Sequence, residues 1–311
     1  MVVEPPRKFQ HRYGRHIFWF VVTFLTTTAV GWNHYASFRI SQGTASADQI
    51  YAWGWVLGGL WYAVPLLMIL GAHEFGHYWY CRKHNVDASL PYFLPLPPIP
   101  YLLPSLTGTL GAVIRIKEPF PSVRALFDIG VAGPIAGFLV LLPCLYFGIT
   151  ESAVVRFPEN VPLIYFGEPM LFKALAWLHF GELPQGFDIV LHPLGFAAWF
   201  GMLATALNLL PFGQLDGGHI AYAVFGRRAR FVSVATLAST LLLTLESASW
   251  VSMAIMMLVM AFFLGVRHPH IRDEGTPLDR GRKAIALVAL IMFVLCFTPV
   301  PIEFFFGTPN Q

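Results

Sequence analysis

Long apolar segments, separated by short stretches rich in Lys and Arg, run through most of this 311-residue chain. A helix needs about 20 apolar residues to cross the hydrocarbon core of a bilayer. Seven segments come close to that length or exceed it, namely residues 16–34, 53–80, 126–149, 193–212, 229–246, 249–267 and 283–300, although 229–267 can be divided differently. Only 12% of the residues are charged, about half the share of an ordinary soluble domain. The sequence therefore predicts an all-α polytopic membrane protein with six or seven transmembrane helices.

The distribution of Lys and Arg predicts how these helices cross the membrane. Basic residues precede the first predicted span, follow the second, precede the third, follow the fourth and separate the sixth from the seventh. The alternate loops, 33–52 and 150–192, are poor in basic residues. Cytoplasmic loops carry the excess of Lys and Arg in membrane proteins. We therefore expect a cytoplasmic N-terminus, with residues 1–52 forming a cytoplasmic segment, the first span and an outer loop.

Residues 89–121 are apolar but too rich in Pro and Gly for a straight helix. Within them, GTLGAVIRI (108–116) has the β-branched alternation of a strand. Irregular backbone at membrane depth is tolerated only where protein or a water-filled cavity satisfies it. We therefore expect a membrane-embedded β-hairpin-like segment that lines a cavity. Residues 160–187 predict an amphipathic helix at the outer surface.

A polar cluster, HEFGH at residues 73–77, interrupts the second apolar segment. His73 and His77 are four residues apart, so both imidazoles project from one face of a helix and can hold one metal ion. Glu74 need not be a ligand and can take a proton from a water bound to the metal. The alternative is a pair of histidines hydrogen-bonded inside the bundle, but ionisable residues inside a membrane are costly and usually functional.

Small residues predict how this helix packs. Gly76 lets another backbone approach closely, and AGPIAG (132–137) gives the third span a small-residue face. We expect the third span to pack against the helix that carries the histidines.

A catalytic zinc takes a third protein ligand and leaves one position for water, and Asp216 is the best candidate. It lies in NLLPFGQLDGGH (208–219), which follows the fourth predicted span on the cytoplasmic side. Pro211 and Gly213 break the helix, and the glycine pair after Asp216 favours a turn that points it inward. The alternative, a solvent-exposed Asp-Gly turn, is disfavoured by the apolar sequence on both sides.

Other polar residues give weaker indications. We do not expect His219 to be a ligand, because the site already has three. His192, before a proline, is either a rim residue of the site or a surface histidine. Asp128 predicts an N-cap for the third span, Glu246 an interfacial charge, and RHPHIR (267–272) at most adventitious metal binding.

The two metal motifs, HEFGH and NLLPFGQLDGG, resemble those of the site-2 proteases, the intramembrane zinc metalloproteases. The similarity runs from about Val56 to Ala229 and also covers GTLGAVIRI, DIGVAGPIAGF (128–138) and HPLGFAAWFGMLATALNLLP (192–211). It is strongest to the branch of bacterial and plant chloroplast members without an inserted PDZ domain, for which no linker here is long enough. We expect a metalloprotease core at 53–228, followed by C-terminal transmembrane helices and a tail at 229–311.

The resemblance implies that His73, His77 and Asp216 hold one Zn²⁺ per chain and that Glu74 is the general base. It gives Asn208 the task of holding the substrate or the developing oxyanion, whereas the alternative is a helix-packing amide. The implied reaction is hydrolysis of a peptide bond in or near a transmembrane segment of a membrane-anchored protein, with 89–121 accepting the substrate as an added strand.

The resemblance also implies a multi-pass protein of the cell membrane, for which we expect the bacterial inner membrane and an active site nearer the cytoplasmic side. The expected partners are the lipid bilayer and a membrane-anchored protein substrate, with no nucleic acid. The sequence assigns no oligomeric state.

Two other functions use the same residues. A metal-ion transporter would hold its ion transiently at His73, His77 and Asp216, and Glu74→Gln would leave its metal flux largely intact. A catalytically inactive membrane-binding homologue would bind substrate helices without cutting them. The presence of Glu74 argues against this second reading, because an inactive homologue is free to lose its base.

Overall fold

The computed structural model describes residues 12–46, 53–98, 106–116, 118–156, 163–264 and 271–305, without 272 and 274. Some predictions fall outside these residues: the basic residues before position 12, positions 99–105 and 117 of the 89–121 segment, and all of RHPHIR except Ile271.

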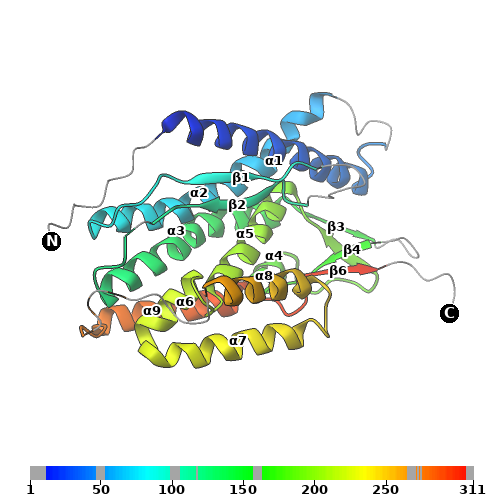
Figure 1. The fold of residues 1–311 in the computed structure, drawn as a ribbon. Helices are drawn as coiled ribbons and strands as arrows, with labels where there is room; N and C mark the ends of the chain where they lie inside the picture. Colours follow the sequence, from blue (N-terminus) through cyan, green and yellow to red (C-terminus); the bar gives the residue numbers. More distant parts are fainter. Residues whose placement is uncertain are drawn as a thin grey trace.

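Helices make up most of the described structure (Figure 1). The longer ones are α1 (Tyr13–Ser41), α2 (Leu60–Lys83, preceded by the 3-10 helix η2 over Trp53–Gly59), α3 (Val123–Thr150), α5 (Pro193–Leu209), α7 (Ala229–Leu243), α8 (Ser249–Leu264) and α9 (Arg280–Cys296). The shorter ones are α4 (Met170–Phe180), which lies in the segment expected to hold an amphipathic helix, α6 (Asp216–Phe225) and the 3-10 turn η3 (Gly226–Arg228).

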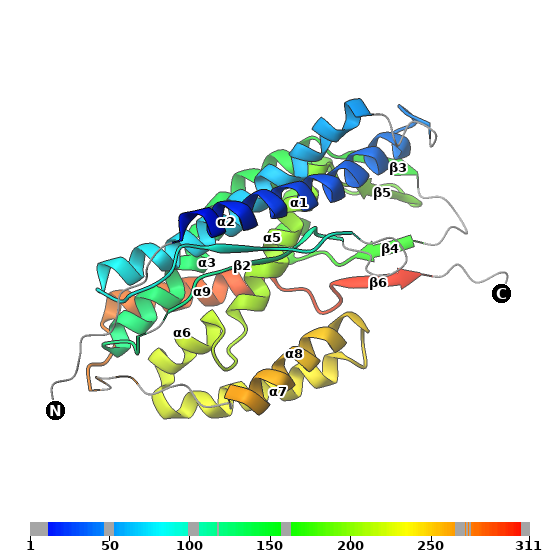
Figure 2. The same cartoon turned by 45° about the horizontal axis from the view of Figure 1, so that its top comes forward.

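The centre of the fold is α3, which packs against both α2 and α5. Large side chains from all three helices are wholly or almost wholly buried between them, among them Leu66, Leu141 and Met202. α1 covers α2, and α9 lies on α3 and α5. α7 and α8 form a hairpin on the side of the molecule away from α1 (Figure 2).

Each predicted span coincides with a helix, but the lengths differ. Two helical stretches of the described chain, Val56–Lys83 and Val123–Thr150, are 28 residues long and, by length and composition, apolar enough to cross a membrane. α1 has 29 residues but is more polar, with a run of threonines at 26–28. α5, α7, α8 and α9 have 17, 15, 16 and 17 residues, fewer than the ~20 of a full span. The chain is thus mostly helical and has helices suited to a membrane, while the number of spans stays a prediction.

α5 ends at Leu209, before the predicted limit of residue 212, and a separate short helix, α6, follows it. Leu210 precedes Pro211, whose ring disfavours helical backbone in the residue before it, and Leu210 has ψ 126°. The chain then turns at Gly213, which has φ +52°, and begins α6 at Asp216. Pro211 and Gly213 therefore break the helix as predicted.

Three antiparallel two-stranded pairs complete the described fold. β1 (Tyr92–Pro95) pairs with β2 (Thr109–Val113), so the described part of 89–121 forms a hairpin-like ribbon beside α1 (Figure 2). β3 (Ala153–Arg156) pairs with β5 (Phe187–Val190), and β4 (Leu163–Phe166) pairs with β6 (Ile302–Phe305). The sequence did not predict these last two pairs, because each joins short runs that are far apart in the chain.

Glycine sets the distance between α2 and α3. A Cβ atom at Gly76 would lie 2.5 Å from the carbonyl oxygen of Ala132 and 3.0 Å from the Cβ of Ala136. The backbone of α3 cannot move aside to accommodate such a Cβ atom, so the crossing of α2 and α3 requires glycine at position 76. The predicted packing of AGPIAG against the histidine helix is confirmed.

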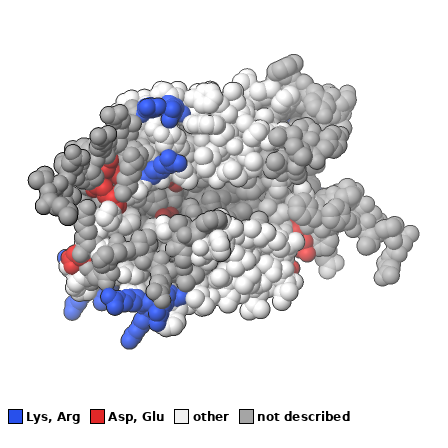
Figure 3. All heavy atoms as spheres, viewed as in Figure 1, with Lys and Arg blue, Asp and Glu red and all other residues white. Residues whose placement is uncertain are grey.

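Lys and Arg gather at one end of the helices (Figure 3). This end holds Arg82 and Lys83 of α2, Arg124 of α3, Arg227 and Arg228 of η3, and Arg280, Arg282 and Lys283 of α9. The opposite end carries Glu151, Glu168, Glu182, Asp188 and Glu303, with Arg39, Arg156 and Lys173. Lys and Arg are therefore concentrated at one end of the helices, although Asp128, Asp273 and Asp279 lie at the same end.

Asp128 does not cap α3, contrary to the prediction. The N-cap is Ser122, whose hydroxyl accepts a hydrogen bond from the Ala125 amide, since serine is itself a preferred cap. Asp128 lies further along the helix and accepts two hydrogen bonds from the Arg282 guanidinium of α9, at 2.8 and 2.7 Å. Its Oδ2 is also 3.0 Å from His84 Nε2, just after α2. Asp128 therefore joins three elements at the basic end.

Arg282→Gln is expected to lower the free energy of unfolding by about 1–3 kcal/mol, because it leaves the largely buried Asp128 carboxylate without its charged donor. Arg280→Gln, two residues away on an exposed part of α9, is the matched control and should change stability by less than about 0.5 kcal/mol. Thermal unfolding in detergent compares the two variants. Equal melting temperatures would show that the Asp128–Arg282 contact does not stabilise the fold.

Candidate metal centre

α2 carries the polar cluster on the face that it turns toward α3. His73, Glu74 and His77 are all buried, with exposed fractions of 7%, 8% and 6%. The 3.6-residue repeat of the helix places the two imidazoles one above the other on that face.

Two glycines of α3 make room for the imidazole rings. A Cβ atom at Gly133 would collide with the ring of His77, and one at Gly137 would lie 3.2 Å from the Cβ of His73. Any larger residue at Gly133 would displace His77. The AGPIAG run therefore does more than bring the helices together, because it also forms the space in which the metal-binding face lies.

α3 also fixes the orientation of the His77 ring. Nδ1 of His77 lies 2.7 Å from the backbone carbonyl oxygen of Ile129. A carbonyl only accepts, so Nδ1 carries the proton, and Nε2 is left with a free lone pair. Metal-binding histidines are commonly oriented by such a bond from the second ring nitrogen.

Asp216 reaches the same point from α6. It is the first residue of this helix, and the glycine pair after it does not form the predicted turn. Gly217 and Gly218 lie inside α6, where Cβ atoms would collide with the carbonyls of Leu209 and Phe212. The glycines thus allow the start of α6 to pack against the end of α5, and this contact positions the Asp216 carboxylate.

Three ligand atoms converge where the helices meet. Nε2 of His73 is 3.0 Å from Nε2 of His77 and 3.1 Å from Oδ2 of Asp216, and the His77–Asp216 distance is 3.3 Å. Tetrahedral zinc with bonds of 2.0–2.1 Å places its ligand atoms about 3.3–3.4 Å apart. Two histidines and a carboxylate are also a donor set that catalytic zinc uses. The residues present therefore fit a zinc ion with one position open.

Glu74 lies beside these atoms without joining them. Its carboxylate accepts a hydrogen bond from the backbone amide of Ile114, directly after β2. Among the described residues, the only group of at least three His, Cys, Asp or Glu side chains whose ligand atoms converge is His73, His77 and Asp216. Glu74 is therefore free to act on a water molecule or a substrate.

A cavity of about 260 Å³ opens in front of this group. His73, Glu74, His77, Asn208 and Asp216 all line it. One wall is formed by three consecutive residues at the end of the ribbon, Ala112, Val113 and Ile114. The structure thus places every residue predicted for the site around one space.

Asn208 is the second-last residue of α5, with its Nδ2 atom 3.4 Å from Nε2 of His73. This position puts an amide donor at the edge of the metal site. A purely helix-packing role would not require contact with a ligand.

His192 is neither a rim residue nor a surface residue. It precedes α5, and its Nδ1 accepts a hydrogen bond from the Leu194 amide at 3.3 Å. Burial lowers its pKa, which favours the neutral ring that this cap requires. Asn208 lies sixteen residues further along the chain, roughly 24 Å away at the rise of an α-helix.

Some residues of the site could not be identified from the sequence. Gln214 and His219 line the cavity, and the Cβ of His219 packs 3.1 Å from the position of a Cβ at Gly130. The Ile129 carbonyl is a backbone group and leaves no residue-type signal. Gly133 and Gly137 of AGPIAG are four residues apart, as are the two histidines of α2. This matching spacing could have predicted the space that α3 leaves for the two imidazole rings.

Comparisons with known proteins identify the family of this chain. The model of Peptidase family M50 matches residues 61–248. The chain is 32% identical over 256 residues to the probable zinc metalloprotease EGY2, chloroplastic, of Arabidopsis thaliana, covering 81% of this chain and 43% of that protein. It is also 30% identical over 254 residues to EGY1 and 32% identical over 254 residues to EGY3 of the same plant, covering 76% and 75% of this chain and 42% of each relative.

The chain thus spans less than half the length of these curated relatives. No solved structure gives a significant match. Both metal motifs, in α2 and α6, lie inside the range that the family model matches. The chain belongs to peptidase family M50, the site-2 protease family of zinc metalloproteases.

Proposed function

We propose that this chain is an intramembrane zinc metalloprotease, which hydrolyses a peptide bond in or near a transmembrane segment of a membrane-anchored protein. The observation that carries the proposal is the convergence of His73, His77 and Asp216 beside Glu74 at one cavity. That cavity lies among helices apolar enough for a membrane. The relatives named probable zinc metalloproteases support the same reaction class.

His73, His77 and Asp216 would hold the zinc ion. When bound, zinc acts as a Lewis acid that lowers the pKa of a water molecule to about 7 and polarises a carbonyl.

Glu74 is the general base of the proposed reaction. Its carboxylate takes a proton from the attacking water and gives it to the leaving amine nitrogen as the peptide bond breaks. The amide of Ile114 holds one side of the carboxylate, which keeps it turned toward the cavity. The Asn208 amide donates a hydrogen bond to the oxygen of the scissile carbonyl as negative charge develops there.

The free edge of β2 is the proposed binding site for the substrate backbone. β2 pairs with β1 on one side, and β1 packs against α1, where His16 Nδ1 lies 3.0 Å from the Pro91 carbonyl oxygen. Residues 112–114 line the metal cavity. A substrate unwound to an extended strand can pair there, which exposes its peptide bonds to attack.

The concentration of Lys and Arg at one end supports a membrane orientation with that end, and hence the N-terminus, in the cytoplasm. The site lies between the C-terminal half of α2 and the C-terminal end of α5, nearer the basic end. We therefore propose a multi-pass protein with its active site toward the cytoplasmic side. The bacterial inner membrane stays a prediction, and the curated relatives are named chloroplastic.

Glu74→Gln should abolish cleavage while zinc remains bound, with a fall in rate of about 10²–10⁴-fold. The amide keeps an oxygen that can accept from Ile114 but cannot take up the proton. Membrane proteomes of cells expressing wild type or Glu74→Gln can be compared, and intact substrates should accumulate in the variant. Cleavage at the parental rate would refute the protease assignment. Undiminished zinc flux into proteoliposomes would instead favour a transporter.

His73→Ala and Asp216→Ala should each lose most of the one zinc expected per chain, because each removes a ligand and leaves two. His219→Ala is the matched control, since His219 lines the same cavity without belonging to the converging group. Elemental analysis of the purified proteins measures the zinc content. Loss of zinc only in the control would mean that the ligand set is wrong.

Asn208→Ala should lower kcat on an identified substrate by about 10²–10³-fold with zinc retained, as expected for loss of an oxyanion donor. Thr205→Val is its control, because Thr205 is a buried polar residue of α5 whose hydroxyl bonds only within the helix, to Gly201. Equal kcat values for the two variants would leave Asn208 as a packing residue.

A further inference from the structure

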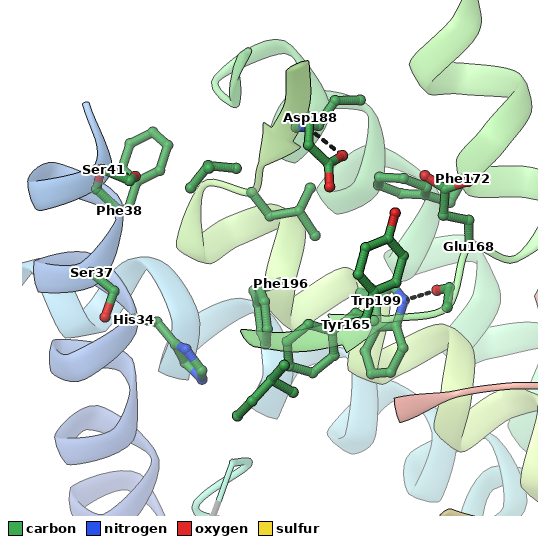
Figure 4. Close-up of a pocket in the computed structure, with 16 residues that line it drawn as sticks. His34, Ser37, Phe38, Ser41, Tyr165, Glu168, Phe172, Asp188, Phe196 and Trp199 are labelled. Carbon is green, nitrogen blue, oxygen red and sulfur yellow. Dashed lines mark hydrogen bonds between the residues drawn. The ribbon is translucent and has the colours of Figure 1, made fainter. Parts of the chain in front are cut away.

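A second cavity, here called the distal cavity, lies near the opposite end of α5 from the metal site. Figure 4 shows the residues that line it. It has a volume of about 450 Å³ and is lined by α1, α5, β4, β5 and the start of α4. It shares no lining residue with the metal cavity. Phe196 of the distal cavity and Asn208 of the metal cavity are twelve residues apart in α5, roughly 18 Å at the rise of a helix.

The walls of the distal cavity are aromatic and held in place. The ring of Phe166 lies 4.6 Å from that of Phe196 and 5.1 Å from that of Trp199. The indole nitrogen of Trp199 donates to the Gly167 carbonyl at 2.7 Å, so its polar atom is already satisfied. His34 lies 4.4 Å from Phe196. Trp199 is only 2% exposed, whereas Tyr165 is 44% exposed, so the Tyr165 ring offers the aromatic surface that a guest can contact.

The charged groups of the distal cavity are acidic. Its lining contains Asp188 and Glu168 and no Lys or Arg. Oδ1 of Asp188 accepts from the adjacent Ile189 amide at 2.7 Å, and no Lys or Arg of the described chain pairs with this carboxylate. Glu168 pairs with Lys173 at 3.5 Å, but both side chains are largely exposed, so the pair is weak.

Tyr165 faces the same acidic group. The Asp188 carboxylate raises the pKa of the Tyr165 phenol, which places the two groups within electrostatic reach of each other, as Figure 4 also shows. Two carboxylates, a phenol and aromatic walls match a cation on an apolar stem.

The distal cavity is also bordered by two strands with an open edge. Three consecutive residues of β4 (164–166) and three of β5 (188–190) line it. β4 pairs only with β6 and β5 only with β3 in the described structure. Neighbouring residues of a strand point to opposite faces, so consecutive lining residues mean that the strands present their backbone to the cavity. An extended peptide can form hydrogen bonds there.

We propose that the distal cavity binds an extended segment of the substrate just outside the membrane, through a Lys or Arg side chain of that segment. The cation meets Asp188 and Glu168, and its aliphatic stem lies on the aromatic walls. This inference rests on the proposed function and names its substrate class. Lys and Arg are scarce on the outer side of membrane proteins, so a basic residue there separates a substrate from the bulk of membrane helices.

The distance between the cavities sets the spacing in the substrate. A chain covering roughly 18 Å needs about 5 residues when extended and about 12 when helical. The basic residue is therefore expected about 5–12 residues from the cleaved bond, on its outer side.

Peptide binding to the 311-residue protein tests the proposal. The probes are a fluorescein-labelled Val-Thr repeat peptide with one central Arg and the same peptide with Gln in its place, measured by anisotropy in the Glu74→Gln background to prevent cutting. We expect the Arg peptide to bind about tenfold more tightly. Adding Asp188→Asn should remove that preference, and Glu168→Gln should reduce it. Glu182→Gln, an exposed acid outside the cavity, is the matched control and should leave it unchanged.

Equal binding of the two peptides, or an unchanged preference in Asp188→Asn, would overturn the proposal. So would native mass spectrometry showing an aminophospholipid that Asp188→Asn loses, because the occupant would then be a lipid. Failure of the proposed function is distinguishable, since it appears as absent cleavage in the protein with Glu74 intact. If the tighter binding of the Arg peptide disappears in Asp188→Asn, the proposed binding site in the distal cavity is supported, whether or not the protein with Glu74 intact shows cleavage.

Discussion

The close crossing of α2 and α3 is the constraint on which the site depends. Gly76 of α2 and Gly133 of α3 remove the side chains that would otherwise separate the two backbones. Only at this distance can the Ile129 carbonyl reach Nδ1 of His77. The same crossing supplies the space for both imidazoles, so helix packing and ligand geometry are one requirement in this protein.

The burial of the polar cluster between the helices has a physical explanation. Burying two imidazoles and two carboxylates away from water is costly unless each has a partner. His77 is paired with Ile129, Glu74 with Ile114, and Asp216 lies within 3.3 Å of both imidazoles. The remaining free lone pairs point at one place, and a divalent cation satisfies them together. The chemistry and the stability of the core are therefore linked.

The sequence predicted which side chains come together better than it predicted the backbone that positions them. HEFGH and its spacing predicted the two histidines and Glu74, and the helix breakers at Pro211 and Gly213 led to Asp216, because residue type alone limits what these positions can do. The turn predicted at Gly217 and Gly218 was wrong, because the sequence does not distinguish a glycine that allows close packing from a glycine that forms a turn. Asp128 was also misassigned, because its partner Arg282 is 154 residues away. The pairs β3–β5 and β4–β6 were missed for the same reason.

α6 is the one ligand-bearing element that is not continuous with the central helices. It has ten residues, follows two breaks in the chain, and contributes a carboxylate 143 positions from its partner His73. The entropic cost of closing a loop grows only slowly with its length. The cost of closing even this long loop is therefore moderate, and a single bound ion can link the two halves of the chain. During synthesis, the half that ends with α3 is complete long before α6 emerges. α6 also packs directly on α3 and α5, so an ion held at this site would add to protein contacts that already join the early and late parts of the chain.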